Sequence, residues 1–131
     1  MAKMEFSGTE EVMEALSREL ERLERKATEM LGEAGQVVVQ AWQDTITEHG
    51  HVETGAMRDS VRASRVSRKG EAYTTSIYPH GKDARGTGNA EKAFILHYGT
   101  SRINGDHFVD DAEARAEDAA NAAMERIWNT D

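Results

Sequence analysis

The sequence predicts an α+β fold in which a long N-terminal helix precedes a small antiparallel β-sheet and a C-terminal helix. Three observations lead to this prediction. Apolar residues with helical spacing open the chain, alternating β-forming residues follow near residue 60, and an alanine-rich stripe with helical spacing closes it. The 131 residues suit a single domain, 1–131, with a helix over 9–49, a β-rich middle over 54–105 and a helix over 106–129.

The first helix is expected to begin near Thr9, because Ser7 and Glu10 have the spacing of a capping box. Its apolar side chains recur three and four residues apart and form one stripe. The stripe comprises Met13, Leu16, Leu20, Leu23, Ala27, Met30, Ala34, Val37 and Ala41. About 40 helical residues span roughly 60 Å, which exceeds a compact domain of this size. We therefore expect either a kink near residues 32–35 or a first half that projects from the body.

The middle of the chain is predicted to form a hairpin that turns at Lys69 and Gly70. Its second strand alternates polar and β-forming residues up to Ile77. Glycines, one proline and mixed charges over residues 79–92 indicate a mobile loop. The apolar run at 93–99 is either a strand or a helical turn. The last helix carries a stripe of Val109, Ala112, Ala116, Ala119, Ala123 and Ile127.

The net charge of −8 is unevenly distributed. Residues 1–53 carry 5 basic and 12 acidic side chains, residues 54–105 carry 9 and 4, and residues 106–131 carry 2 and 8. The basic middle is expected either to be neutralised by the acidic helices of its own fold, the simpler interpretation, or to pair with neighbouring copies.

No catalytic motif is present, and we expect neither enzymatic activity nor a cofactor. The chain has no cysteine, no Gly-x-Ser-x-Gly and no phosphate-binding loop of the G-x-x-x-x-G-K-[ST] type. His49, His51 and Glu53 could bind a divalent metal, but no clear further ligand is evident elsewhere, so a solvated helix end is the favoured interpretation and no metal is expected. A histidine-bound metal enzyme is the weakest of the alternative classes.

Nucleic-acid and membrane partners are also disfavoured. Arg62, Arg65 and Arg68 form a basic strand, but the chain is acidic overall and 6% aromatic, which argues against sequence-specific nucleic-acid binding. No apolar run is long enough to span a membrane, and the first residues lack the apolar region of a signal peptide.

Three segments occur in order after the acidic helix: "VETGAMRDSV", "FILHYGTS" and "DHFVDDAEARAE". This order resembles a family of tailed-bacteriophage and prophage proteins that act as neck, head–tail joining, tail-completion or minor tail components. The matching positions are Thr54, Gly55, Met57, Arg58, Ser60, Val61, Tyr98, Gly99, Thr100, Phe108 and Ala112. The sequence departs from the family pattern at His97, where an acidic residue is common, and at His107, which replaces the proline before Phe108.

We expect the first of these segments to be a structural corner. Gly55 is expected to let the chain reverse after the helix, with Thr54 as a cap for the short turn that follows. Met57 would then be buried, and Arg58 would face outward.

The resemblance implies a non-enzymatic structural protein of the virion, assembled in the host cytoplasm. It implies a homo-oligomeric ring around the DNA channel, expected to be a hexamer, that contacts neighbouring phage connector and tail proteins. Candidate structural or subunit-contact residues are Thr54, Gly55, Arg58, Ser60, Arg62, Arg65, Tyr98, Gly99, Thr100 and Phe108. A tail-terminator ring is one alternative. A coiled-coil dimeric adaptor or regulator, built on the stripe from Met13 to Ala41, is another.

Overall fold

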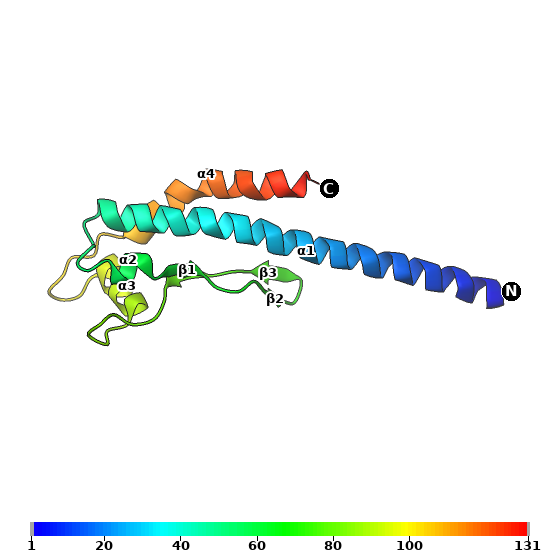
Figure 1. Ribbon diagram of the computed structural model, residues 1–131, viewed down its shortest axis with the longest axis horizontal. Coiled ribbons are helices and arrows are strands. Elements are labelled where there is room, and N and C mark those ends of the chain that lie inside the picture. Colours follow the sequence, from blue (N-terminus) through cyan, green and yellow to red (C-terminus); the bar gives the residue numbers. More distant parts are fainter. Residues whose placement is uncertain (1, 131) are drawn as a thin grey trace.

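The computed structural model describes the backbone of residues 2–130 and the side chains of residues 8–130. Helix α1 (Ala2–Glu48) runs the length of the molecule (Figure 1). Helix α4 (Phe108–Trp128) packs antiparallel along one side of its C-terminal half. A β-hairpin and two short helices, α2 (Ala56–Asp59) and α3 (Asn89–Tyr98), cover another side. The α+β fold predicted from the sequence is therefore confirmed.

Helix α1 is longer than predicted. It begins at Ala2 rather than near Thr9, and the Ser7 side chain proposed as its cap lies outside the described side chains. It continues without a break through residues 32–35, so the predicted alternative of a kink there is wrong. Gly35 is buried and lies close to the hairpin, since a β-carbon there would lie 3.3 Å from the β-carbon of Ala63. The N-terminal half projects beyond the rest of the molecule (Figure 1).

The predicted hairpin is present but interrupted. Strands β1 (Val61–Ala63) and β4 (Ile77–Pro79) form one antiparallel pair, and β2 (Ser67–Lys69) and β3 (Ala72–Thr74) form another near the turn. Between the pairs, the Thr75 hydroxyl donates to the Ser64 carbonyl at 2.6 Å, and the Ser76 backbone N–H donates to the Ser64 hydroxyl at 2.9 Å. The Ser64 backbone N–H also donates to the Ser76 carbonyl at 2.7 Å, so side-chain hydrogen bonds supplement the backbone pairing between the two strand pairs.

The loop after the hairpin is shorter than the predicted span of 79–92. Pro79 ends β4, and α3 already begins at Asn89, so the apolar run at 93–99 is helical up to Tyr98. Asp83 organises the intervening loop. Its carboxylate accepts the backbone N–H groups of Arg85 and Thr87, each at 2.9 Å, and pairs with Lys92 on α3.

The core lies where α1, α4, the hairpin and α3 meet. Trp42 and Phe108 are in edge-to-face contact at its centre, with ring centroids 5.8 Å apart. The α4 stripe follows the prediction except that Ala120 is buried and Ala119 is exposed. The buried core cluster comprises Trp42, Ile46, Met57, Val61, Ala93, Phe108 and Ala112.

No described helix is both long and apolar enough to cross a membrane.

Candidate functional site

The segment from Thr54 to Ser60 forms a corner between α1 and the hairpin. Gly55 has φ +87°, a left-handed conformation that favours glycine. The Thr54 hydroxyl accepts the backbone N–H of Ala56 at 3.3 Å, and the Ser60 hydroxyl donates to the Met57 carbonyl at 2.8 Å. Helix α2 is thus closed at both ends by side-chain hydrogen bonds.

The two sides of this corner differ in burial. Met57 faces the core, whereas the Arg58 and Asp59 side chains lie at the surface and form an ion pair of 2.9 Å. The Gln43 side chain of α1 donates to the Arg58 carbonyl at 3.2 Å, which ties the corner to the long helix. The segment therefore serves as a packed corner that leaves one arginine at the surface.

The basic hairpin is exposed and largely unneutralised. Among the described side chains, neither Arg62 nor Arg65 makes an ion pair, and both residues are exposed. The Arg68 guanidinium donates to the Gly70 carbonyl at 2.8 Å instead of pairing with an acid. The basic middle is therefore neutralised within the fold only in part. Three of its basic residues form ion pairs in the described structure, namely Arg58, Arg85 and Lys92, whereas the hairpin arginines form none there. Two carboxylates of α1 pair with α4, where Arg115 contacts Glu48 and Arg126 lies 3.5 Å from Glu33.

The Tyr98-Gly99-Thr100 segment forms the turn from α3 toward α4. Gly99 has φ +85°, and a β-carbon there would lie 2.5 Å from the Gly105 nitrogen. The Thr100 hydroxyl accepts the backbone N–H groups of Arg102 and Ile103, each at 3.2 Å. The Tyr98 ring is exposed and lies 4.8 Å from the ring of Phe94, which is exposed as well. This turn therefore presents an aromatic pair to solvent.

Helix α4 begins at Phe108, two residues after the predicted start at 106. The backbone conformation of His107 accounts for the histidine that stands in place of the family's proline. His107 has φ +54°, which the ring of proline cannot adopt because it holds φ near −65°. The His107 backbone N–H donates to the His97 carbonyl at 3.0 Å, and His97 Nδ1 accepts the Val109 N–H at 3.2 Å. The start of α4 is thus anchored on the end of α3.

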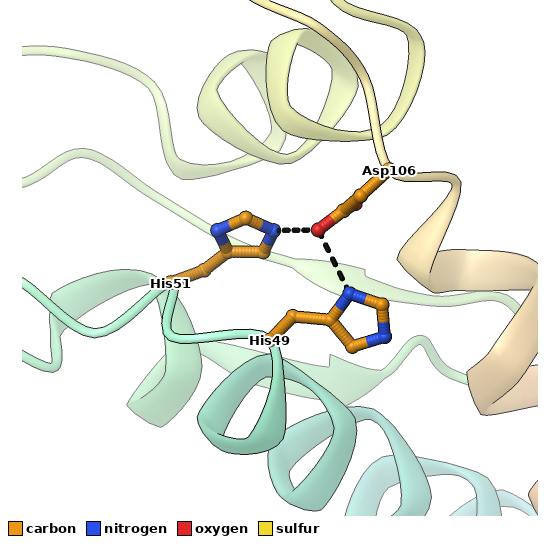
Figure 2. Close-up of side chains that lie close together, drawn as sticks. All are labelled: His49, His51 and Asp106. Carbon is orange, nitrogen blue, oxygen red and sulfur yellow. Dashed lines mark hydrogen bonds and ion pairs between the residues drawn. The ribbon is translucent and has the colours of Figure 1, made fainter.

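Two histidines at the end of α1 meet a carboxylate at the start of α4 (Figure 2). His49 Nδ1 lies 2.8 Å from Asp106 Oδ2, and His51 Nε2 lies 2.5 Å from the same oxygen. His49 Nε2 also lies 2.7 Å from Asp111 Oδ2. The exposed fractions of the His49, His51 and Asp106 side chains are 22%, 15% and 31%, so the cluster is half-buried and open to water.

Hydrogen bonding between His49 and Asp106 shifts the pKa of each toward its charged form. The hydrogen bond that His49 donates to the Asp106 carboxylate raises the pKa of His49 and outweighs the desolvation that would lower it; a hydrogen bond to Asp111 raises this pKa further. Desolvation acts to raise the pKa of Asp106, but hydrogen bonds from His49 and His51 overcome it and leave the pKa below its usual value. The arrangement favours positive charge between these carboxylates.

The expectation that no further ligand accompanies His49 and His51 is wrong, and Glu53 is not part of the cluster. The third group is Asp106, 55 residues beyond His51 in sequence. The His-x-His spacing and the aspartate before Phe108 are both visible in the sequence. Their meeting depends on the antiparallel packing of α4 against α1, which no local pattern encodes.

A comparison with models of known protein families gives a match over most of the chain. The family model described as "Bacteriophage HK97-gp10, putative tail-component" matches residues 10–98. This range is more than half of the 131 residues and includes the corner, the hairpin and α3, but not Asp106 or α4. No curated protein and no solved structure matches the chain.

Proposed function

The chain belongs to the HK97-gp10-like family of bacteriophage tail components, and from this premise we propose that it is a non-enzymatic subunit of a homo-oligomeric ring in the virion. The ring surrounds the DNA channel at the head–tail junction or at the end of the tail, with six copies expected. It contacts neighbouring connector and tail proteins, and it assembles in the host cytoplasm.

The observation that carries this proposal is the projecting half of α1 (Figure 1). Met13, Leu16 and Leu20 of the apolar stripe are 53% to 66% exposed there, and the adjacent Val12 is 57% exposed. Burial of such a side chain stabilises by about 1.5–3 kcal/mol, so a contiguous apolar stripe left in water favours association. A second chain covering this stripe is the simplest way to bury it.

Charge favours a neighbouring copy as that second chain. The stripe begins beside Glu10, Glu11 and Glu14, whereas the hairpin displays Arg62 and Arg65 without ion-pair partners among the described residues. A ring requires two different complementary surfaces on each subunit. The acidic, apolar half of α1 and the basic hairpin supply two such surfaces, and they lie on different elements.

A coiled-coil dimeric adaptor or regulator is the second candidate, and the same stripe favours it. In a parallel or antiparallel dimer the stripe packs against its own copy, so the basic hairpin takes no part. The two candidates therefore differ in the number of subunits and in the surface of the neighbouring subunit that α1 contacts. In the ring that surface is the basic hairpin, and in the dimer it is the other copy of α1. A tail-terminator ring differs from a joining ring in its neighbours rather than in these surfaces.

The test is the assembly state of the purified full-length chain, measured by light scattering after size-exclusion chromatography and by electron microscopy. We expect closed rings for the native chain and monomers for the double variant Leu16→Gln with Leu20→Gln. The matched control is Arg18→Gln with Glu21→Gln, which changes the opposite face of the same helix, spares the acidic residues at 10–14 and leaves net charge unchanged; it should still form rings. Dimers of the native chain would favour the adaptor.

The position in the virion needs a separate experiment on the phage or prophage that encodes the chain. With the gene deleted, a joining role predicts filled heads beside separate tails, and a tail-terminator role predicts tails of uncontrolled length. Intact virions after deletion would contradict both roles.

A further inference from the structure

We propose that His49, His51 and Asp106 bind a divalent cation of the zinc class. Their ligand atoms, one from each side chain, all lie within 4.8 Å of one another (Figure 2). Two imidazole nitrogens and one carboxylate oxygen form a donor set that Zn²⁺ commonly takes in proteins, with a fourth position left for water or another ligand. Mg²⁺ and Ca²⁺ prefer oxygen donors and fit this set poorly.

The three ligands are held in place before any ion arrives. Asp106 Oδ1 accepts the backbone N–H of Phe108 at 3.1 Å, which leaves Oδ2 directed at the two imidazoles. The His51 ring packs edge-on against Phe108, with centroids 5.3 Å apart. The backbone N–H groups of His49 and His51 donate to carbonyls of the last turn of α1 at 2.9 Å and 3.0 Å.

The distances require only a small adjustment to admit a metal. In a tetrahedral zinc site with bonds of about 2.0–2.1 Å, neighbouring ligand atoms lie about 3.3 Å apart. The two nitrogen–oxygen distances to Asp106 are 2.8 Å and 2.5 Å. They need to widen by roughly 0.5–0.8 Å, which rotation of half-buried side chains can supply.

Asp111 gives the cluster a feature typical of metal-binding histidines. A histidine that binds a metal through one ring nitrogen usually donates its other N–H to a carboxylate or carbonyl. His49 Nε2 lies 2.7 Å from Asp111 Oδ2, while its Nδ1 faces the candidate site. A dication would also neutralise the two carboxylates, Asp106 and Asp111, that converge on this point.

A second group of potential ligands, His97, His107 and Asp110, is less suited to a metal. His97 Nδ1 already accepts the Val109 N–H, and His107 Nδ1 lies 3.9 Å from Asp110 at the exposed surface. This group serves as an internal comparison. Binding at the first site would link the end of α1 to the start of α4, and it is independent of ring assembly.

The experiment uses the full-length chain, purified without a histidine tag and treated with a chelator. Zn²⁺ binding is measured by titration calorimetry and by metal analysis after dialysis. We expect one Zn²⁺ per chain, a rise in Tm on addition of Zn²⁺, and no response to Mg²⁺. His51→Ala and Asp106→Asn should abolish stoichiometric binding, and Asp111→Asn should weaken it by about 10–100-fold.

The controls separate this site from other histidines. Asp110→Ala, at the second group, should bind Zn²⁺ as the native chain does. Nitrogen NMR shifts of the native chain, with and without Zn²⁺, show directly whether His49 Nδ1 and His51 Nε2 bind, so the result does not depend on a variant's folding. Absence of stoichiometric Zn²⁺ binding, or shifts confined to other histidines, would overturn the proposal.

Discussion

Gly99 and Gly105 face each other backbone to backbone: a β-carbon on Gly99 would lie 2.5 Å from the Gly105 nitrogen, and one on Gly105 would lie 2.6 Å from the Gly99 nitrogen. Real β-carbons do not come so close to other atoms, so neither position accepts a side chain without a backbone shift. This contact brings the residue after Gly105, Asp106, toward the histidines at the end of α1. The glycine of the Tyr-Gly-Thr motif thus positions the start of α4.

We predict that Gly105→Ala destabilises the chain by about 2–3 kcal/mol, because the added methyl group collides with the backbone of His97 and Tyr98. Urea unfolding followed by circular dichroism measures this change. The control is Gly32→Ala, because a β-carbon at Gly32 meets nothing within 4 Å and its helix is continuous. That control should stabilise by about 0.5–1 kcal/mol. Equal stability of the two variants would contradict the proposed close approach.

The features predicted correctly from the sequence are those encoded by local patterns. The three- and four-residue spacing from Met13 to Ala41 predicted α1, and the turn at Lys69 and Gly70 predicted the hairpin. The run at 93–99 was ambiguous because short apolar segments fit a strand or a helix equally well. The structure resolves it as part of α3 because its buried face, at Ala93 and His97, has helical spacing.

The candidate metal site could not be predicted in full for a different reason. His49 and His51 lie two residues apart in sequence, but Asp106 joins them only because α4 packs back along α1. The left-handed conformation of His107 is similarly set by its hydrogen bond to the end of α3. Contacts of this kind depend on tertiary packing, so a single sequence shows the ligands without showing that they meet.

Phe108 supports both the core and the candidate site. It is fully buried and contacts the rings of Trp42, His49 and His51. We predict that Phe108→Ala destabilises by about 3–5 kcal/mol through the cavity left behind. Phe108→Leu retains much of the volume and should cost less. Denaturant unfolding of both variants measures the difference, and a cost for Phe108→Ala below that of Phe108→Leu would contradict this role.

The interactions of Asp83 in the loop before α3 should make the free energy of unfolding depend on pH. The ion pair with Lys92 lowers the pKa of Asp83, and the backbone N–H of Thr87 lowers it further. A carboxyl group whose folded pKa lies below its unfolded value stabilises the fold above the unfolded pKa, and that contribution is lost as the pH falls through the folded pKa. We therefore predict that Asp83→Asn is less stable than the native chain near neutral pH.

The difference in unfolding free energy between the native chain and Asp83→Asn should shrink as the pH falls below about 4. Urea unfolding at about pH 6 and about pH 3 measures it. Asp118→Asn on α4 is a control, because among the described residues its side chain makes no hydrogen bond or ion pair. A constant difference for Asp83→Asn across this pH range would show that its carboxylate charge has no part in loop stability.

The charge-pairing model of assembly gives the last prediction. Arg62→Glu with Arg65→Glu should prevent ring formation while leaving the monomer folded, because both side chains are exposed and make no ion pair among the described residues. Light scattering gives the assembly state, and circular dichroism checks the fold. Lys82→Glu with Arg102→Glu changes net charge equally outside the hairpin and should still assemble.

Charge reversal on the opposite surface distinguishes direct pairing from general repulsion. Adding Glu10→Arg and Glu14→Arg to the hairpin variant should restore part of the assembly, because the attraction is re-formed with its signs exchanged. The same two α1 substitutions in the native background should weaken assembly. Sodium chloride should weaken native assembly too, since exposed charges are screened over about 10 Å at 0.1 M. Normal rings from the hairpin variant would refute charge pairing at this surface and leave the apolar stripe of α1 as the main contact.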